Sequence, residues 1–177
     1  MPRIRFTAVA LSAALAFAAA LPASALTFTA TLNGANERPN PLPTTATGTG
    51  TVVLADDEMS IDVSLSWSGL TGGNAILAHI HGPAGPNATA PPLIDLSSFL
   101  PPVPNSTGQL TGSPLHFAVT APQVADLKNG LWYMNVHSNE FPNGEIRGQL
   151  VPEPASTLLL AAGLGGLAWK GRRARRV

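Results

Sequence analysis

Three of the chain's four histidines have the residue type and the spacing to bind a metal ion. His79 and His81 form a His-x-His pair in the segment ILAHIHGPAGP. On a β-strand, residues i and i+2 point to the same face with Cα atoms about 6.6–7 Å apart, so both imidazoles can converge on one ion. His137 ends the segment YMNVH, where alternation places it on one face with Tyr133 and Asn135. If the two strands are neighbours, three nitrogens meet at a site with open positions, which suits copper or zinc.

The same side chains also have a structural interpretation, which the sequence leaves open. The histidines could be structural residues, hydrogen-bonded to backbone carbonyls and to Glu145 or Asn135. Glu145 and Arg147 share a strand face, and an ion pair or hydrogen-bonded fixture that closes the sheet is favoured over a polar binding pair. His116 lies outside both histidine motifs, so we expect an ordinary surface or packed residue. The acidic turn at 56–58 could bind calcium, although such turns are usually only solvated.

The elements that must position these residues are predicted to be short β-strands separated by turns. Segment 59–67 (MSIDVSLSW) has the cleanest alternation, and with 47–54 it predicts a hairpin-like pair with a wet outer face. Segment 121–130 is the one plausible core helix, with Thr120 as its cap and Gly130 at its end. Further strands are predicted at 26–32, 74–82, 93–96, 113–120, 131–138 and 144–150. About seven or eight antiparallel strands at this spacing predict an all-β, Greek-key-like sandwich or barrel.

Charge and composition narrow the function classes. Between residues 26 and 151 there are three basic residues against nine acidic ones, an excess of six negative charges. This acidic core has no electrostatic footprint for nucleic acid. The chain has no cysteine, which excludes thiolate catalysis and iron–sulfur clusters and leaves the fold to rely on its own core. Gly-x-Ser-x-Gly, Walker and His-Glu-x-x-His motifs are absent as well.

The N-terminal end reads as a targeting segment. Residues 1–25 have two early arginines, a long apolar run and a small-x-small box that ends at Ala25. This pattern predicts a signal peptide cut by signal peptidase after Ala25. We therefore expect three parts: the signal peptide, a β-domain at 26–151 and a sorting segment at 152–177.

The C-terminal end carries a second targeting pattern. Pro152, Glu153 and Pro154 precede an apolar, helix-capable run at 155–169. Fifteen residues rise roughly 22 Å as a helix, short of a hydrocarbon core of roughly 30 Å, so the run predicts a transient anchor. By the positive-inside rule, the basic cluster that follows keeps its end in the cytoplasm; its members are Lys170, Arg172, Arg173, Arg175 and Arg176.

These three parts, in this order, resemble the PEP-CTERM sorting signal of Gram-negative bacteria that make exopolysaccharide. The resemblance implies recognition of the tripeptide by an exosortase, a membrane cysteine transpeptidase, and removal of the tail. It also implies delivery to the cell surface or the extracellular matrix. An ordinary C-terminal membrane anchor is the alternative interpretation.

The middle of the chain resembles the CHRD domain, named for chordin, a secreted regulator of bone morphogenetic proteins. The segments that carry the resemblance are LTFTATLNGANERP, AHIHGPAG and LKNGLWYMNVHSNEFPNGEIRGQL. The sequence departs from the family pattern at SNEFPNGE, where the family more often has a Thr after the His and a second Gly. The resemblance implies an all-β extracellular module and no defined catalytic activity.

Two functions from different classes follow. The first is a non-enzymatic surface or matrix module that binds an extracellular polysaccharide or a surface protein, together with a copper or zinc ion. The second is a copper- or zinc-dependent oxidoreductase, because the His-x-His of AHIHG is similar to that of the copper–zinc superoxide dismutases. That enzyme type needs further ligands and a bridging histidine, which the sequence does not show. Redox turnover separates the two functions.

Overall fold

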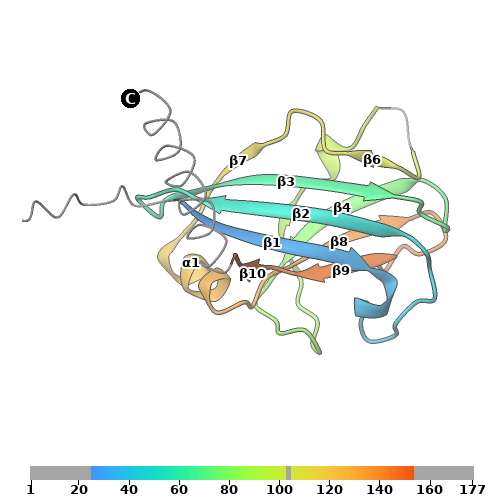
Figure 1. Cartoon of the computed structure of the whole chain (residues 1–177), viewed down its shortest axis with the longest axis horizontal. Coiled ribbons are helices and arrows are strands. Elements are labelled where there is room, and N and C mark those ends of the chain that lie inside the picture. Colours follow the sequence, from blue (N-terminus) through green and yellow to red (C-terminus); the bar gives the residue numbers. More distant parts are fainter. Residues whose placement is uncertain (1–24, 103–104, 154–177) are drawn as a thin grey trace, which may run out of the picture.

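Alternating apolar and polar residues build one curled antiparallel sheet, which a computed structural model describes over residues 25–102 and 105–153 (Figure 1). The strands run in the order β5-β4-β8-β9-β1-β2-β3-β6, while β10 pairs with β1 and β7 pairs with β3. Their bounds are β1 (Leu26–Asn33), β2 (Thr47–Leu54), β3 (Ser60–Ser68), β4 (Ala75–His81), β5 (Pro92–Asp95), β6 (Gly108–Gln109), β7 (Leu115–Ala118), β8 (Tyr133–Ser138), β9 (Ile146–Gln149) and β10 (Val151–Pro152). Two 3₁₀ turns, η1 (Gly34–Asn36) and η2 (Ser97–Phe99), and one helix, α1 (Ala121–Lys128), complete the described elements. The all-β prediction is confirmed.

The β2–β3 hairpin shows how the local pattern produces the core. Its register pairs Val52 with Val63 and Leu54 with Ile61, and these four side chains are buried. On the opposite face, the hydroxyls of Thr49 and Ser66 lie 2.9 Å apart in an exposed position. The predicted hairpin with one wet face is therefore confirmed.

Two strands were not predicted, because they are too short to show alternation. Strands β6 and β10 have two residues each, and a two-residue segment has no period to detect. The long-range neighbours were not predicted either. Strand β1 pairs with β2 along its whole length and with β9 and β10 on its other edge, which joins the two ends of the domain.

Helix α1 begins and ends close to the predicted positions. Gln123 accepts a hydrogen bond from the Thr120 backbone N–H at 2.8 Å, so the N-terminus is capped. Val124 and Leu127 are buried against the core. Gly130 follows with a φ of +68°, a left-handed conformation that glycine adopts readily after a helix.

Strands β4, β8 and β9 have two very different faces. Ile80, Met134, Val136 and Ile146 point into the hydrophobic core and are fully buried. The opposite face carries a layer of polar side chains that are also buried: His79, His81, Tyr133, Asn135, His137 and Arg147. Loops around Glu37, Ala90 and Pro142 contribute contacts to this layer. It is in this layer that the candidate site lies.

The predicted signal peptide falls outside the described residues except for Ala25, which is exposed. Pro154, the apolar run and the basic cluster at 170–176 also lie outside them. Within the described ranges, none of the helices has the length and apolar character to cross a membrane.

Candidate metal centre and adjacent cleft

Strand pairing brings the three predicted histidines together. Strand β8 runs antiparallel beside β4, with His79 opposite Asn135 and His81 opposite Tyr133. Because directly opposite residues point to the same face, His137 becomes a diagonal neighbour of His79. The ring centroids of His79 and His137 are 4.9 Å apart, and those of His79 and His81 are 5.3 Å apart. The sequence left this pairing as a condition for a three-histidine cluster, and the structure meets that condition.

Each histidine has one ring nitrogen turned towards the cluster and one turned towards an oxygen. His137 Nδ1 lies 2.9 Å from the carbonyl oxygen of Pro142, and His81 Nδ1 lies 2.9 Å from that of Ala90. His79 Nε2 lies 3.6 Å from a carboxylate oxygen of Asp95. Each ring offers one nitrogen as a ligand atom, and the three ligand atoms all lie within 4.8 Å of one another.

The protons on these rings do not satisfy every nitrogen. Burial lowers the pKa of all three histidines, and that of His137 falls to about 4, so at neutral pH each ring carries one proton. A carbonyl can only accept, so His81 and His137 each hold their proton on Nδ1. The Nε2 atoms of both rings therefore present lone pairs, and that of His81 is buried without a hydrogen-bond partner.

His79 cannot satisfy both of its neighbours. Its Nδ1 lies 3.0 Å from the lone pair of His137 Nε2, and its Nε2 faces the carboxylate of Asp95. One proton serves only one of these contacts and leaves two electron-rich atoms opposed at the other. A cation in the cluster would remove the conflict, because it would accept the lone pairs of His79 Nδ1, His81 Nε2 and His137 Nε2. The three N–H groups would then each face an oxygen, as is usual for metal-bound histidines.

The donor set fits zinc or copper(II). Both bind neutral imidazole, and three protein ligands leave a coordination position for water or another ligand. Zinc–nitrogen bonds of about 2.0–2.1 Å would place tetrahedral ligand atoms about 3.4 Å apart. His79 and His137 are already that close. The three ligand atoms lie within 4.8 Å of one another, so ion binding would require the widest separation to shorten by up to about 1.4 Å.

A stack of three side chains holds His81 in place. The His81 ring lies parallel to the Tyr133 ring at 4.7 Å, and the Arg147 guanidinium covers the other side of Tyr133 at 3.5 Å. Arg147 also donates to the carbonyls of Gly85 and Ala88 at 3.1 and 2.8 Å. It thereby fixes the 82–91 loop that carries the Ala90 carbonyl bound by His81. The stack is a cation–π arrangement in a buried setting, where such contacts are strongest.

Glu37 is a buried acid beside this cluster that the sequence did not indicate. Its carboxylate accepts a hydrogen bond from Asn135 Nδ2 at 2.6 Å, and only 4 % of the residue is exposed. Burial raises the pKa of Glu37 to about 7, although the positive charge of Arg147 opposes the shift. Gly144, with a φ of +124°, packs so closely here that a Cβ would lie 2.5 Å from Asn135 Nδ2.

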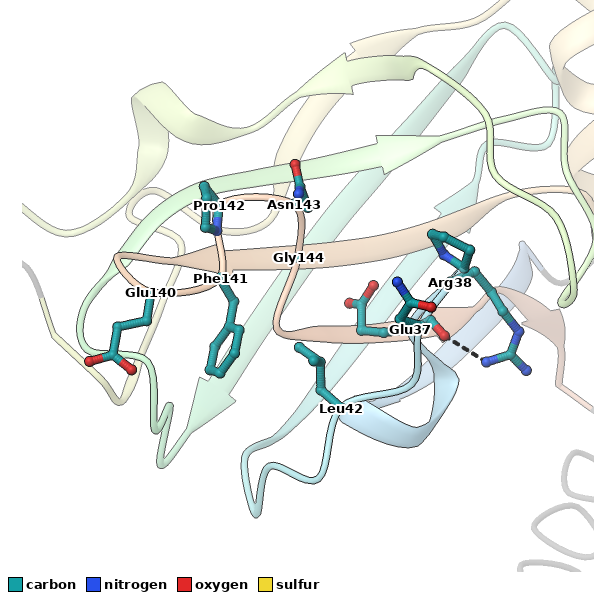
Figure 2. Close-up of a pocket in the computed structure, with 10 residues that line it drawn as sticks. Glu37, Arg38, Leu42, Glu140, Phe141, Pro142, Asn143 and Gly144 are labelled. Carbon is teal, nitrogen blue, oxygen red and sulfur yellow. Dashed lines mark hydrogen bonds between the residues drawn. The ribbon is translucent and has the colours of Figure 1, made fainter.

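An open cleft of about 320 Å³ lies over Glu37, between the chain that follows η1 and the turn before β9 (Figure 2). Figure 2 shows the Glu37 side chain directed at the segment that carries Gly144. Hydrogen-bonding side chains and apolar ones both line the cleft, namely Glu37, Arg38, Asn40, Glu140 and Asn143 together with Pro39, Leu42, Phe141, Pro142 and Gly144. Pro142 is therefore shared, because the residue lines the cleft and its carbonyl oxygen lies 2.9 Å from His137 Nδ1.

Glu145 and Arg147 do not pair with each other, and each binds a different set of loops. Glu145 accepts hydrogen bonds from the Thr44 hydroxyl at 2.7 Å, from both the N–H and the hydroxyl of Thr71 at 2.7 and 2.9 Å, and from the Gly72 N–H at 3.1 Å. The carboxylate thus ties two loops to the end of β8–β9, which is the hydrogen-bonded fixture favoured from the sequence. The Glu145–Arg147 ion pair, which the sequence left as the other possibility, does not form, because Arg147 donates to the 82–91 loop instead.

The remaining predicted residues that the structure describes lie outside the histidine cluster. His116 is exposed and pairs with Asp62 at 2.9 Å, as expected for a surface residue. Pro152 lies in β10, and the Glu153 backbone N–H donates to Thr27 O at 2.9 Å. Among the site residues, sequence reasoning missed Asp95, whose only signal is its place in the short strand predicted at 93–96. It also missed the carbonyl partners, which have no sequence signal.

Comparison with known proteins agrees with both resemblances. The CHRD domain family matches residues 28–150, and the PEP-CTERM protein-sorting motif matches residues 150–176. No curated protein matches the chain significantly, and no solved structure does so either. The sorting motif implies bacterial export, sorting to the cell surface and processing of an exosortase type. The chain belongs to the CHRD domain family and carries a C-terminal PEP-CTERM sorting motif.

Proposed function

We propose that the domain is a non-catalytic surface module that binds one copper(II) or zinc ion through His79, His81 and His137. The observation that supports this most strongly is the mismatch of protons in the cluster. The buried Nε2 of His81 has no hydrogen-bond partner, and the single proton of His79 leaves either its contact with His137 or its contact with Asp95 unsatisfied. Buried polar atoms normally have partners, so three ring nitrogens that converge with too few protons favour a cation there.

Metal stoichiometry tests this proposal. The full chain, purified without an affinity tag, is loaded with copper or zinc, desalted and analysed for metal per chain. We expect near one ion per chain in the wild type and in His116→Ala, which removes an exposed histidine outside the cluster. The double variant His79→Ala/His81→Ala should lose the ion. Absence of metal in the wild type, with the double variant merely less stable, would make the cluster structural.

The alternative, a copper–zinc oxidoreductase, is tested on the same loaded protein. Within the described residues, the three histidines form the one group of metal-capable side chains, whereas a dismutase of that type needs a second set of ligands. We therefore expect no superoxide turnover above that of free copper. Turnover that disappears in the double histidine variant would establish the enzymatic function instead.

We also propose that the cleft over Glu37 carries the interaction role and accepts a neutral, hydroxyl-bearing unit of an extracellular polysaccharide. A volume of about 320 Å³ is at the small end of ligand sites. Side-chain amides, carboxyl groups and the Phe141 ring match hydroxyls and an apolar ring face. The excess of acidic residues in the domain disfavours an anionic polymer. A surface protein is the other partner class that we consider.

Ligand titration tests the cleft. Neutral hexoses and a hexuronic acid are added to the isotope-labelled chain, and backbone amide shifts are followed by NMR. We expect the neutral sugars alone to move the amides of the 37–42 and 140–144 segments. Asn143→Ala should weaken this response, because its exposed amide lines the cleft. Asp126→Asn, a change of a partly exposed residue on α1 that does not line the cleft, is the control. No shifts with any sugar would leave a surface protein as the partner.

The route of delivery completes the proposal. We propose a signal-peptidase cut after Ala25, transient membrane insertion of the 155–169 run and a Gram-negative host. Intact mass of the surface-delivered protein tests the two ends together. A mass that begins at Leu26 and lacks the arginine-rich tail supports this route, whereas retention of Lys170 to Val177 would indicate a permanent anchor.

A further inference from the structure

The sorting motif begins inside the folded sheet. In β10, Val151 pairs with Thr29 and Pro152 pairs with Phe28 of β1. One residue further, the Glu153 backbone N–H donates to the carbonyl of Thr27 at 2.9 Å. Figure 1 shows β10 in line with β9 and beside β1. The first two residues of the Pro-Glu-Pro tripeptide are therefore held on the edge of β1.

The register explains why proline is tolerated there. Hydrogen-bonded and non-hydrogen-bonded pairs alternate along an antiparallel ladder. Because Glu153 bonds to Thr27, the 28/152 pair is a non-hydrogen-bonded one, and the missing N–H of Pro152 removes no bond. By the same alternation, the backbone groups of Thr27 and Thr29 point towards β10, while those of Phe28 point towards β2.

We propose that β10 is a clasp that withholds Pro152 and Glu153 from the exosortase while it is paired, and that sorting acts on chains in which β10 has left β1. An enzyme that binds an extended peptide needs the peptide's backbone groups. Those of Val151 and the N–H of Glu153 are already bonded to β1. This inference rests on the sorting motif and is independent of the metal and sugar proposals.

The clasp is built to open without unfolding the domain. It is a two-residue strand, and residues 151–153 are all exposed, with 49 % of Val151 accessible to solvent. Leu150, directly before it, is fully buried, and its N–H donates to Trp132 O at 2.9 Å. Short, exposed strand ends open locally at low free energy, whereas buried positions open only with the whole domain. Opening therefore stops at Leu150.

A disulfide that locks the clasp tests the proposal. The chain has no cysteine, so Thr29→Cys/Val151→Cys introduces the one bridge, formed in the exported chain and checked by intact mass. Thr49→Cys/Ser66→Cys is the matched control, since it bridges an exposed pair of β2 and β3 away from the motif. The readout is the fraction of tail-bearing chain over time in an exosortase-containing host.

We expect the locked chain to be processed about tenfold more slowly than the wild type, because only the open fraction is competent. Reductant should restore the rate, and the control bridge should leave it unchanged. Processing of the locked Thr29→Cys/Val151→Cys chain at the wild-type rate would overturn the proposal, since the exosortase would then read the paired strand directly.

A second variant weakens the pairing of β10 with β1, whereas the disulfide strengthens it. Thr29→Pro removes an N–H that points towards β10 and leaves the β1–β2 ladder its donors. In the purified chain, hydrogen exchange at the Glu153 amide, which donates to Thr27 O, should be several-fold faster than in the wild type. Exchange at the buried Leu150 amide serves as the internal control, because general unfolding would accelerate both sites. An unchanged rate at Glu153 would contradict the proposed opening.

Discussion

His137 lies diagonally across the strand pair from His79, with His137 Nε2 3.0 Å from His79 Nδ1. Neutral imidazoles at this distance share one proton or one cation. The N–H of His137 already donates to the carbonyl of Pro142. Whether His79 Nδ1 carries a proton or a lone pair therefore depends on the partner of its other nitrogen, Nε2. His79 Nε2 faces Asp95, so this exposed carboxylate controls which nitrogen of His79 carries the proton.

Replacement of Asp95 is expected to weaken metal binding and leave the fold intact. The Asp95 carboxylate favours a proton on His79 Nε2, which leaves the lone pair of Nδ1 available to the ion. Asp95→Asn removes this anion. Loss of such an outer partner typically lowers metal affinity by about tenfold or more. Asp62→Asn is the matched control, because Asp62 pairs with the exposed His116. Competition with a zinc or copper chelator measures both. Equal affinities in the two variants would remove Asp95 from the site.

Glu37 is expected to make the protein less stable as the pH rises. Its pKa is about 7 in the fold against an ordinary 4.5, so between these values the folded chain binds more protons than the unfolded one. The free energy of unfolding then falls with increasing pH through this window. At 1.36 kcal/mol per unit, the total is on the order of 3 kcal/mol.

The variant Glu37→Gln isolates this contribution. The amide does not titrate, so the difference in unfolding free energy between variant and wild type should move in favour of the variant from pH 4 to pH 8. Urea unfolding at several pH values measures it. Parallel stability profiles for the two proteins would show that Glu37 ionises normally.

Glu145 is expected to have the opposite pH dependence. Burial would raise the pKa of Glu145, but the hydrogen bonds from Thr44 and Thr71 outweigh it and lower the pKa below its usual value. Its stabilising effect is therefore complete above the ordinary glutamate pKa and is lost as the pH falls through the lowered value.

Glu145→Gln is expected to lower the unfolding free energy at pH 7 by about 3 kcal/mol, since charge-assisted hydrogen bonds are lost and the amide brings an extra donor. The deficit should shrink in acid, where the wild type also loses its carboxylate. Thermal unfolding at pH 7 and pH 3 measures the change. A deficit that is the same at both pH values would mean that packing, and not charge, is responsible.

Gly144 is expected to tolerate no side chain. Its φ of +124° is strained for an L-residue, and a Cβ would meet Asn135 and Glu37. Gly144→Ala should therefore destabilise the fold by about 2–4 kcal/mol. Gly85→Ala is the control, because a Cβ there has no atom within 4 Å. Chemical denaturation of the two variants gives the comparison, and equal midpoints would mean that the 139–144 turn adapts.

The sequence by itself determined the local features. Alternation predicted which residues of β3 enter the core. It also placed His79 and His81 on one face of their strand, and His137 with Tyr133 and Asn135 on one face of a second strand. Polar and apolar side chains repeat with the two-residue period of a strand, so each of these assignments needs only a few neighbouring residues. The family and the sorting motif were also readable from short segments.

Only the tertiary structure decided which faces meet. The pairing of β4 with β8 joins residues that are 58 positions apart at His79 and His137, and no local period encodes such a neighbour. Asp95, Glu37 and the carbonyls of Ala90 and Pro142 entered the site for the same reason, because loops from distant parts of the chain close over one sheet face. The clasp at Pro152 was equally invisible, since a two-residue strand is defined by the free edge of β1 and not by its own side chains.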